Sequence, residues 1–136
     1  METAPKQIVV LASLRLDHPS MDFHKFASEF ELPLVRIWRA GESCSTPKGQ
    51  LLSGVYESSY CCFRVLEQDD SVQAVFGKLR RIFSELCESE RDLLATEGIV
   101  KSLFCSVEEG VTIRIEDLRF LIDNEINLEI DRFVYD

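Results

Sequence analysis

The sequence predicts one α+β domain in which helices pack on one face of an antiparallel or mixed β-sheet, as in ferredoxin-like folds. Strand-like and helix-like segments follow in the order strand, helix, strand, strand, helix, strand, helix, strand. Two strands meet through a loop without a helix, and no glycine-rich phosphate turn follows the first strand, so a doubly wound parallel sheet fits less well. The chain has 136 residues and no linker or low-complexity segment, so residues 1–136 are expected to form a single domain.

The first half of the chain begins with a strand over Ile8–Leu16, and the first half of this strand is apolar on both faces, so the strand is expected at the sheet centre. Ser20 is then expected to cap a helix that runs to about Glu31. The apolar residues of this helix recur at helical spacing and predict its buried face: Phe23, Phe26, Ala27 and Phe30. A second strand, Leu34–Arg39, follows Pro33.

The middle of the chain reads as a polar loop over residues 41–50 and one long strand over residues 51–67. Asp70 or Ser71 caps the next helix. The apolar stripe of that helix is Val72, Val75, Phe76, Leu79, Ile82, Phe83 and Leu86. Residues 87–98 either extend it or begin a second short helix, and Gly98 is the natural stop.

The last third predicts a strand over Val100–Val107, an extended segment, a helix over Glu116–Asn124 and a final strand over Ile126–Tyr135. The expected buried side of the helix is Leu118, Leu121 and Ile122. Alternation along the final strand directs Ile126, Leu128, Ile130 and Val134 to one face. The other face then receives Asn127, Glu129, Asp131, Phe133 and Tyr135.

Charge is unevenly distributed along the chain. The net charge is -9, and residues 108–136 hold nine of the 24 acidic residues against three basic ones. Such a field repels phosphate backbones, so we expect no nucleic-acid partner. It would attract a basic protein, and the candidate docking residues are Asp123, Glu125, Glu129 and Asp131. The alternative is that these acids form a solvated face that only keeps the protein soluble.

The five cysteines are odd in number and have no C-x-x-C spacing, so we expect free thiols, a reducing compartment and no metal site. The N-terminus lacks the apolar core of a signal peptide, and no apolar run approaches the roughly 20 residues of a membrane span. These features predict a cytoplasmic protein without a membrane partner. No nucleophile–base, P-loop or zinc motif appears, so we expect neither a cofactor nor an enzyme, although an acid pair or Cys44 remains a weak alternative.

The only tryptophan lies in the stretch Val35–Glu42, VRIWRAGE. Strand alternation directs Arg36 and Trp38 to one face and Val35, Ile37 and Arg39 to the other. One interpretation is structural: Trp38 closes the end of the core, arginine stems pack on it and Gly41 makes the turn. The other interpretation is a pocket for a small anion or an interaction hot spot. Its residues would be Arg36, Trp38, Arg39, Gly41 and Glu42.

The same stretch carries a resemblance to a known family. IWRAGE resembles the W-R-x-G-[DE] core of a bacterial family of uncharacterised domains, number 4279 among the domains of unknown function. The C-terminal IRIEDLRFLIDNEINLEIDRFVY is similar to the closing pattern of that family, a leucine-bearing helix and a strand that reads L-x-I-D before a tyrosine. The resemblance runs from about Ile8 to Tyr135, and residues 132–134 depart from it by lengthening the strand between Asp131 and Tyr135. It implies these motif positions: Trp38, Arg39, Gly41, Asp131 and Tyr135.

Two classes of function follow from these observations. The first is a non-catalytic cytosolic binding protein of the immunity type, which neutralises a basic toxin through its acidic surface. The second is a small-ligand module with an anion pocket near Trp38. A homodimer is a further possibility, because Phe133 and Tyr135 on the polar side of the last strand would be available to cover a contact.

Overall fold

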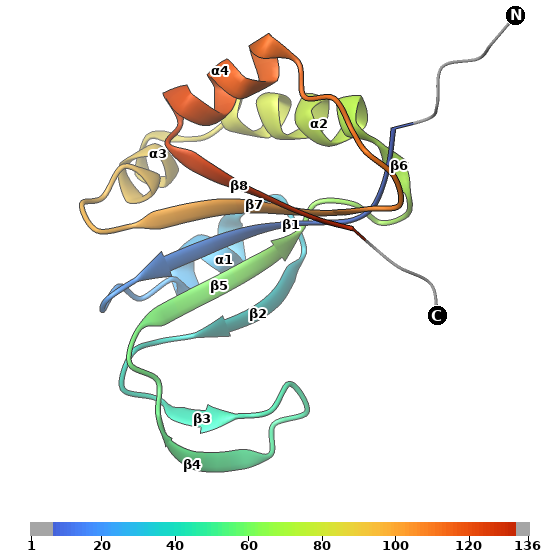
Figure 1. Ribbon diagram of the computed structural model, residues 1–136. Coiled ribbons are helices and arrows are strands. Elements are labelled where there is room, and N and C mark those ends of the chain that lie inside the picture. Colours follow the sequence, from blue (N-terminus) through green and yellow to red (C-terminus); the bar gives the residue numbers. More distant parts are fainter. Residues whose placement is uncertain (1–6, 133–136) are drawn as a thin grey trace, which may run out of the picture.

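The computed structural model describes residues 7–132, which are built around one six-stranded sheet (Figure 1). Five strands lie side by side in the order β2-β5-β1-β7-β8. Their bounds are β1 Ile8–His18, β2 Leu34–Trp38, β5 Ser59–Arg64, β7 Val100–Val107 and β8 Ile126–Arg132. The short β6, Asp70–Ser71, pairs with the first two residues of β1. The most apolar strand, β1, therefore takes the central place that its sequence predicts.

The strand directions confirm the ferredoxin-like, mixed character of the sheet. β1 is antiparallel to both β5 and β7, and β2 is antiparallel to β5. With the helices between them, these four strands have the connections and order of a split β-α-β unit. β8 is an addition that pairs in parallel with β7 after a crossover helix. The fold class predicted from the sequence is thus correct.

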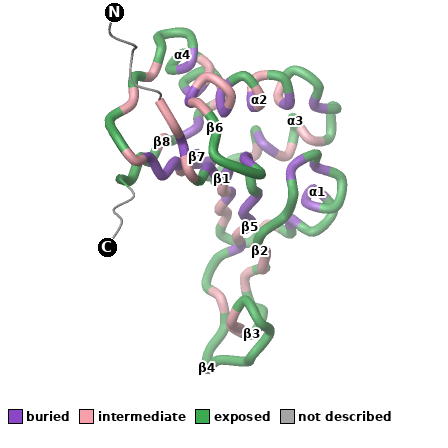
Figure 2. The backbone as a smooth tube through the Cα atoms, turned by 90° about the vertical axis from the view of Figure 1, so that its right-hand side faces the viewer, coloured by how far each residue is buried: buried purple, intermediate pink, exposed green. Residues whose placement is uncertain are grey.

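Four helices cover one face of the sheet (Figures 1 and 2). They are α1 His24–Glu29, α2 Val72–Ser84, α3 Glu88–Leu94 and α4 Ile115–Asp123. α1 and α2 bury the apolar stripes predicted from helical spacing, except that Phe83 is only partly buried. Within residues 7–132, the opposite face of the sheet carries no helix.

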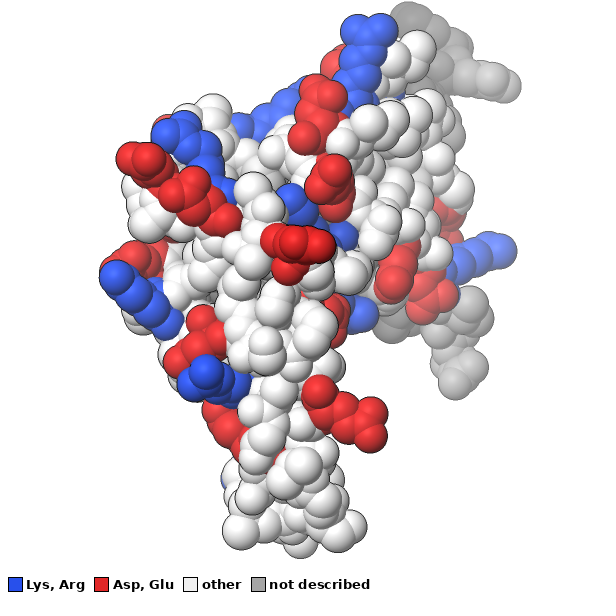
Figure 3. Space-filling view, turned by 90° about the vertical axis from the view of Figure 1, so that its left-hand side faces the viewer, with Lys and Arg blue, Asp and Glu red and all other residues white. Residues whose placement is uncertain are grey.

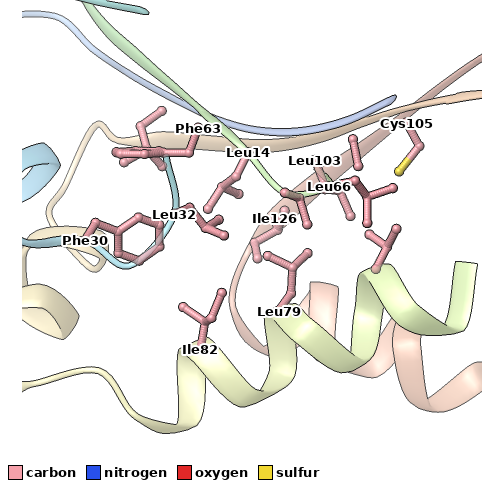
Figure 4. Close-up of a cluster of buried hydrophobic side chains, with 14 of the residues drawn as sticks. Leu14, Phe30, Leu32, Phe63, Leu66, Leu79, Ile82, Leu103, Cys105 and Ile126 are labelled. Atoms are coloured by element: carbon pink, nitrogen blue, oxygen red, sulfur yellow. The ribbon is translucent and has the colours of Figure 1, made fainter. Parts of the chain in front are cut away.

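The core lies between the sheet and the helices (Figure 4). Leu14, Phe63 and Leu103 from three neighbouring strands are fully buried and belong to one cluster with Leu79 of α2. Phe63 also packs edge-on against two rings from the α1 region, with centroids 4.9 and 5.8 Å away. Burial of this size is the main stabilising contribution to such a domain.

The cysteines behave largely as expected from their spacing. All five are free thiols, and Cys61, Cys62 and Cys105 are buried. Burial raises the pKa of the Cys105 thiol to about 11, so this thiol stays protonated at neutral pH. Cys44 is half-buried and Cys87 is exposed, so these two depart from the expectation of buried hydrophobes.

The predicted loop 41–50 and long strand 51–67 are instead a separate hairpin followed by a strand of the main sheet. β3, Ser43–Ser45, pairs with β4, Leu51–Val55, and the two form a sheet of their own. Residues 56–58 break the predicted strand, because the chain turns there into β5. Figure 2 shows the hairpin projecting from the body without a buried segment.

The structure corrects one predicted helix start and decides between the two alternatives for residues 87–98. α1 begins at His24, because the side chain of His18 accepts hydrogen bonds from the backbone N–H groups of Ser20 and Met21 and holds them in a turn. α3 is a separate helix and does not continue α2. The backbone N–H of Cys87 donates to the Glu90 carboxylate at 3.1 Å, and that contact starts the new helix.

The buried side of α4 differs from the prediction. Leu121 is buried as expected, but Leu118 and Ile122 are exposed, and Asp117 is buried in their place. Arg80 of α2 explains the rotation, because its Nη1 lies 2.8 Å from Oδ1 of Asp117. Hydrophobic spacing alone does not reveal a buried ion pair of this kind.

The final strand is described as far as Arg132, so the predictions for Phe133, Val134 and Tyr135 lie outside the described residues. Within the strand, Ile126 is buried and Leu128 is half-buried, as alternation predicts. Ile130 is exposed, because β8 is an edge strand.

Candidate binding site on the uncovered sheet face

The uncovered face of the sheet carries charged and aromatic side chains in rows. Cross-strand register aligns Arg36 of β2 with Cys62 of β5 and Arg15 of β1. The next row aligns Arg64, Ser13 and Phe104. The alternation of a strand thus gives β1 an apolar face toward the helices and a polar face toward solvent.

A hollow of about 450 Å³ opens on this face. It is lined by side chains of β1, β2 and β5: Leu11, Ser13, Arg15, Val35, Arg36, Trp38, Tyr60, Cys62 and Arg64. The volume is within the range of small-molecule sites.

A bulge in β2 shapes one wall of the hollow. Leu34 pairs with Phe63 but Arg36 pairs with Cys62, so Val35 is the extra residue between them. Both Val35 and Arg36 therefore line the hollow, which corrects the prediction that Val35 lies on the opposite face. Ile37 packs against the core, as predicted.

Trp38 lies where the main sheet meets the hairpin. Its ring stacks on Tyr56 at 4.3 Å and on Tyr60 at 4.5 Å between centroids, and its Nε1 donates to the Ser58 carbonyl at 3.1 Å. With two rings already stacked on it, the indole is a fixed wall and not a free stacking platform. Trp38 does not close the helix-covered core, as one interpretation predicted. Its structural contacts lie instead at the junction between the main sheet and the hairpin.

Arg36 and Tyr56 tie the hairpin to the sheet. Arg36 donates to the Ser45 carbonyl and, at 3.2 Å, to the Tyr56 hydroxyl. The Tyr56 hydroxyl accepts from the Ser45 N–H at 3.1 Å. Hydrogen bonding by Ser45 and the nearby Arg36 guanidinium lower the pKa of Tyr56. One part of the Arg36 guanidinium is therefore structural, and the residue also lines the hollow.

Arg15 lies at the centre of the uncovered face. Its guanidinium carbon is 4.5 Å from the centroid of the Phe104 ring, a cation–π contact, and its Nε is buried without a hydrogen-bond partner. Burial raises the pKa of the neighbouring Asp17; Arg15 counteracts this effect and Glu129 adds to it. The Nε–H of Arg15 is therefore a buried donor that no described residue satisfies, and it lies under the Phe104 contact.

The three arginines of the hollow have no carboxylate partner. Within residues 7–132, neither Arg15, Arg36 nor Arg64 has an acidic oxygen within 4.0 Å. Other arginines of the chain do have one, as Arg80 and Arg81 show. The hollow therefore holds three guanidinium groups that form no ion pair among the described residues, with Asp17 and Glu129 nearby on the same face.

The remaining residues of the predicted anion pocket lie elsewhere. Arg39 is exposed and approaches Asp22 at 3.7 Å, so it does not line the hollow. Gly41 adopts a φ of 90° and its N–H donates to the Tyr56 carbonyl, which starts the hairpin. The backbone of Glu42 continues that pairing, since its carbonyl accepts from the Tyr56 N–H at 2.9 Å. Within the described residues, Gly41 and Glu42 therefore form the turn that leads into the hairpin.

The four predicted acidic docking residues form two separate pairs. Glu129 and Asp131 project from edge strand β8 on the uncovered face, opposite Phe104 and Ser106 of β7. Asp123 and Glu125 lie at the turn from α4 to β8, at a second hollow of about 290 Å³. The structure therefore does not join the four into one surface.

Lys101 forms one wall of this second hollow. It is 7% exposed, and its Nζ donates to the Leu94 carbonyl at 2.9 Å, near the C-terminal end of α3. Burial lowers the pKa of Lys101, and Glu125 offsets part of that effect. The arrangement is a cation at a helix C-terminus, which is a structural role.

Four charged or aromatic residues of the site were not predicted from the sequence: Arg15, Tyr56, Tyr60 and Arg64. Arg15 interrupts an otherwise apolar strand, and that interruption is a signal for an uncovered polar face. The two tyrosines had no such signal, because the hairpin that brings Tyr56 beside Trp38 was predicted as one continuous strand.

No family model matches the chain, and no curated protein or solved structure matches it either. The resemblance to domain family 4279 therefore stays a prediction. No helix formed by the described residues is long and apolar enough to cross a membrane. In the same part of the chain, no group of three or more His, Cys, Asp or Glu side chains is arranged to hold a metal ion.

Proposed function

We propose that this protein is a non-catalytic binding module that takes a small anion in the hollow of its uncovered sheet face. The observation that carries the proposal is the convergence of Arg15, Arg36 and Arg64 on one hollow, where none of the three forms an ion pair within residues 7–132, although Asp17 is near enough to interact with Arg15. Guanidinium groups bind carboxylates and phosphates through paired hydrogen bonds. Because Trp38 is already stacked on two tyrosines, recognition relies on charge and not on stacking.

Titration of the intrinsic Trp38 fluorescence tests this function. Trp38 is the only tryptophan, and it lines the hollow. Phosphate, sulfate and citrate are added separately at constant ionic strength. We expect a saturable change with at least one of them, and its absence with all three would contradict the proposal.

A pair of arginine variants gives the matched control. Arg15→Met removes a charge from the hollow, whereas Arg39→Met removes one outside it. We expect Arg15→Met to weaken anion binding by about tenfold or more, since a hydrogen bond to a charged group contributes about 1.5–3 kcal/mol. Arg39→Met should bind as the unaltered protein does. An equal loss in both variants would indicate a general charge effect and would reject the site.

A second candidate function is the immunity-type one, in which the protein docks to a basic partner. It is favoured by the acids that border the same face, where Asp17 and Glu129 influence one another electrostatically. The test compares Glu129→Gln/Asp131→Asn with Asp123→Asn/Glu125→Gln, two variants that each lose two charges. If β8 carries the docking surface, only the first variant should slow association with the basic partner. The same variant should also weaken the dependence of the association rate on salt concentration.

A further inference from the structure

The second hollow, beside Lys101, is lined by residues of α2, α3, β7 and the turn from α4 to β8. It lies at the end of the molecule that faces the viewer in Figure 3, where acidic and basic side chains are interspersed over the upper part. Its charged residues are Arg91, Lys101, Asp123 and Glu125. Within residues 7–132, none of these four forms an ion pair. Charges of both signs therefore surround one hollow without direct contact between them.

Lys101 is the buried member of this set. It is 7% exposed, and one of the three N–H donors of its ammonium group bonds to the Leu94 carbonyl. The described residues supply no second hydrogen bond and no ion pair to Nζ. Lysine is rarely buried to this degree without a paired charge. Besides its structural bond to α3, the ammonium group can therefore serve an anionic group that enters the hollow.

Glu125 supplies acidic character to the same hollow from a strained position. It follows α4 with a φ of 53°, a left-handed conformation that glycine or asparagine adopts more readily at a helix end. It is close enough to Lys101 to offset part of the effect of burial on the pKa of that lysine. A glutamate retained in a strained conformation, without an ion pair in the described residues, points to a task for its carboxylate.

Much of the remaining lining is apolar. Phe83 and Leu86 come from the end of α2 and the turn after it, and Leu94 comes from the end of α3. Leu86 and Leu94 are buried, so they form a fixed apolar surface inside the hollow. The volume of about 290 Å³ is at the lower limit of ligand sites and admits only a small molecule.

We propose that the second hollow binds a free α-amino acid with an apolar side chain. Its carboxylate accepts hydrogen bonds from Lys101 and Arg91, and its ammonium group lies near Asp123 and Glu125. Its side chain packs on the apolar lining.

The mixture of charges selects this class of ligand. A simple anion is repelled by the two acids of the hollow, and a simple cation is repelled by the two bases. A zwitterion is attracted by both pairs, because it carries the complementary charge for each. This hollow includes Lys101 on the helix-covered side of the sheet, so the proposal does not depend on the anion hollow of the uncovered face.

Leucine and three of its relatives test each part of the proposed ligand. Isocaproate is leucine without its amino group, isoamylamine is leucine without its carboxylate, and glycine lacks the apolar side chain. Backbone amide chemical shifts of the full chain are followed in a titration with each compound. We expect leucine to bind about tenfold or more tightly than any of the three, since each lacks one favourable contact. If any relative binds as tightly as leucine, or if leucine does not bind at millimolar concentration, the proposal is overturned.

The same titrations locate the site. We expect the largest shift changes in residues 91–101 and 123–126, which border the hollow. Trp38 fluorescence should stay unchanged, because β5 and β1 separate β2 from β7 in the sheet. Shift changes confined to the surroundings of Trp38 would put leucine in the anion hollow and would overturn the proposal.

Two variants test which end of the amino acid each charge contacts. Lys101→Met and Glu125→Gln each remove a charge and keep a side chain of similar size. Lys101→Met should weaken leucine binding by about tenfold or more and leave the weaker binding of isoamylamine unchanged. Glu125→Gln should weaken leucine binding and leave the binding of isocaproate unchanged. If both variants weaken all three compounds equally, the assignment of the two ends is wrong.

Exposed positions provide the charge controls. Arg91→Met and Arg119→Met each remove one exposed positive charge, but only Arg91 lines the hollow. Arg91→Met should weaken leucine binding, and Arg119→Met should bind leucine as the unaltered protein does. Asp92→Asn is the corresponding control for Glu125→Gln, because Asp92 is exposed on α3 outside the hollow. Equal losses in Arg91→Met and Arg119→Met would indicate a general charge effect and would overturn the proposal.

Discussion

The two faces of the sheet are made from the same strands but carry opposite chemistry. Leu14 and Arg15 are neighbours in β1, yet Leu14 is fully buried under α2 and Arg15 borders a solvent-filled hollow. The covered face gains its stability from close apolar packing, whereas the uncovered face keeps three arginines without acidic partners in the described residues. Alternate residues of one strand thus serve the core and the proposed binding face.

The largest effect is expected on the covered face. Leu14→Ala should lower the free energy of unfolding by about 3 kcal/mol or more, because the deleted group leaves a cavity in a fully buried site. Urea denaturation followed by far-UV circular dichroism measures this. A loss below about 1 kcal/mol would mean that the core collapses around the smaller side chain.

Trp38→Ala tests how much of the structure depends on the junction between the sheet and the hairpin. Removal of the indole abolishes two ring stacks and the hydrogen bond to Ser58, so we expect a loss of about 1–2 kcal/mol. Hydrogen exchange should accelerate in β3 and β4 and remain slow in β1 and β7. Uniform acceleration throughout the sheet would show that Trp38 supports the whole domain.

These two positions also show how far the sequence reveals the structure. Leu14 and its apolar neighbours follow patterns set by local spacing, so the strand, its central position and most buried residues were predictable. The hairpin was not, because residues 41–67 contain apolar and polar side chains without a clear period. The ring partners of Trp38 depend on that hairpin, and of the residues predicted for an anion pocket only Arg36 and Trp38 line the hollow.

Asp117→Asn tests how the buried carboxyl of Asp117, on the helix-covered side of the sheet, affects stability. Burial raises the pKa of Asp117 in the folded protein above its unfolded value, with Arg80 counteracting part of the effect. Stability is therefore lost as pH rises from about 3.9 through the folded pKa. The variant removes that loss, so we expect up to about 1 kcal/mol of added stability at pH 7 and no difference near pH 3. Urea denaturation at both pH values measures it, and destabilisation at pH 7 would show that the ion pair outweighs its desolvation.

The smallest change in stability is expected from Arg15→Met. The side chain lies on the uncovered face and forms no ion pair among the described residues, so the free energy of unfolding should change by less than about 0.5 kcal/mol. Thermal denaturation measures this alongside the anion titration. A large loss of stability would show that the contact with Phe104 is a structural requirement. The uncovered face would then also contribute to the stability of the fold.

The α4–β8 addition has a consequence for what the sheet exposes to other chains. Without β8, β7 would end the sheet and offer its backbone N–H and C=O groups to any incoming strand. Edge strands of this kind template aggregation unless charges or irregularities protect them. β8 replaces that edge with one bearing Glu129, Asp131 and Arg132, and the opposite edge, β2, is interrupted by its bulge at Val35. Both borders of the sheet are thus unfavourable templates for strand addition, and the acidic end of the chain protects the fold from self-templated assembly.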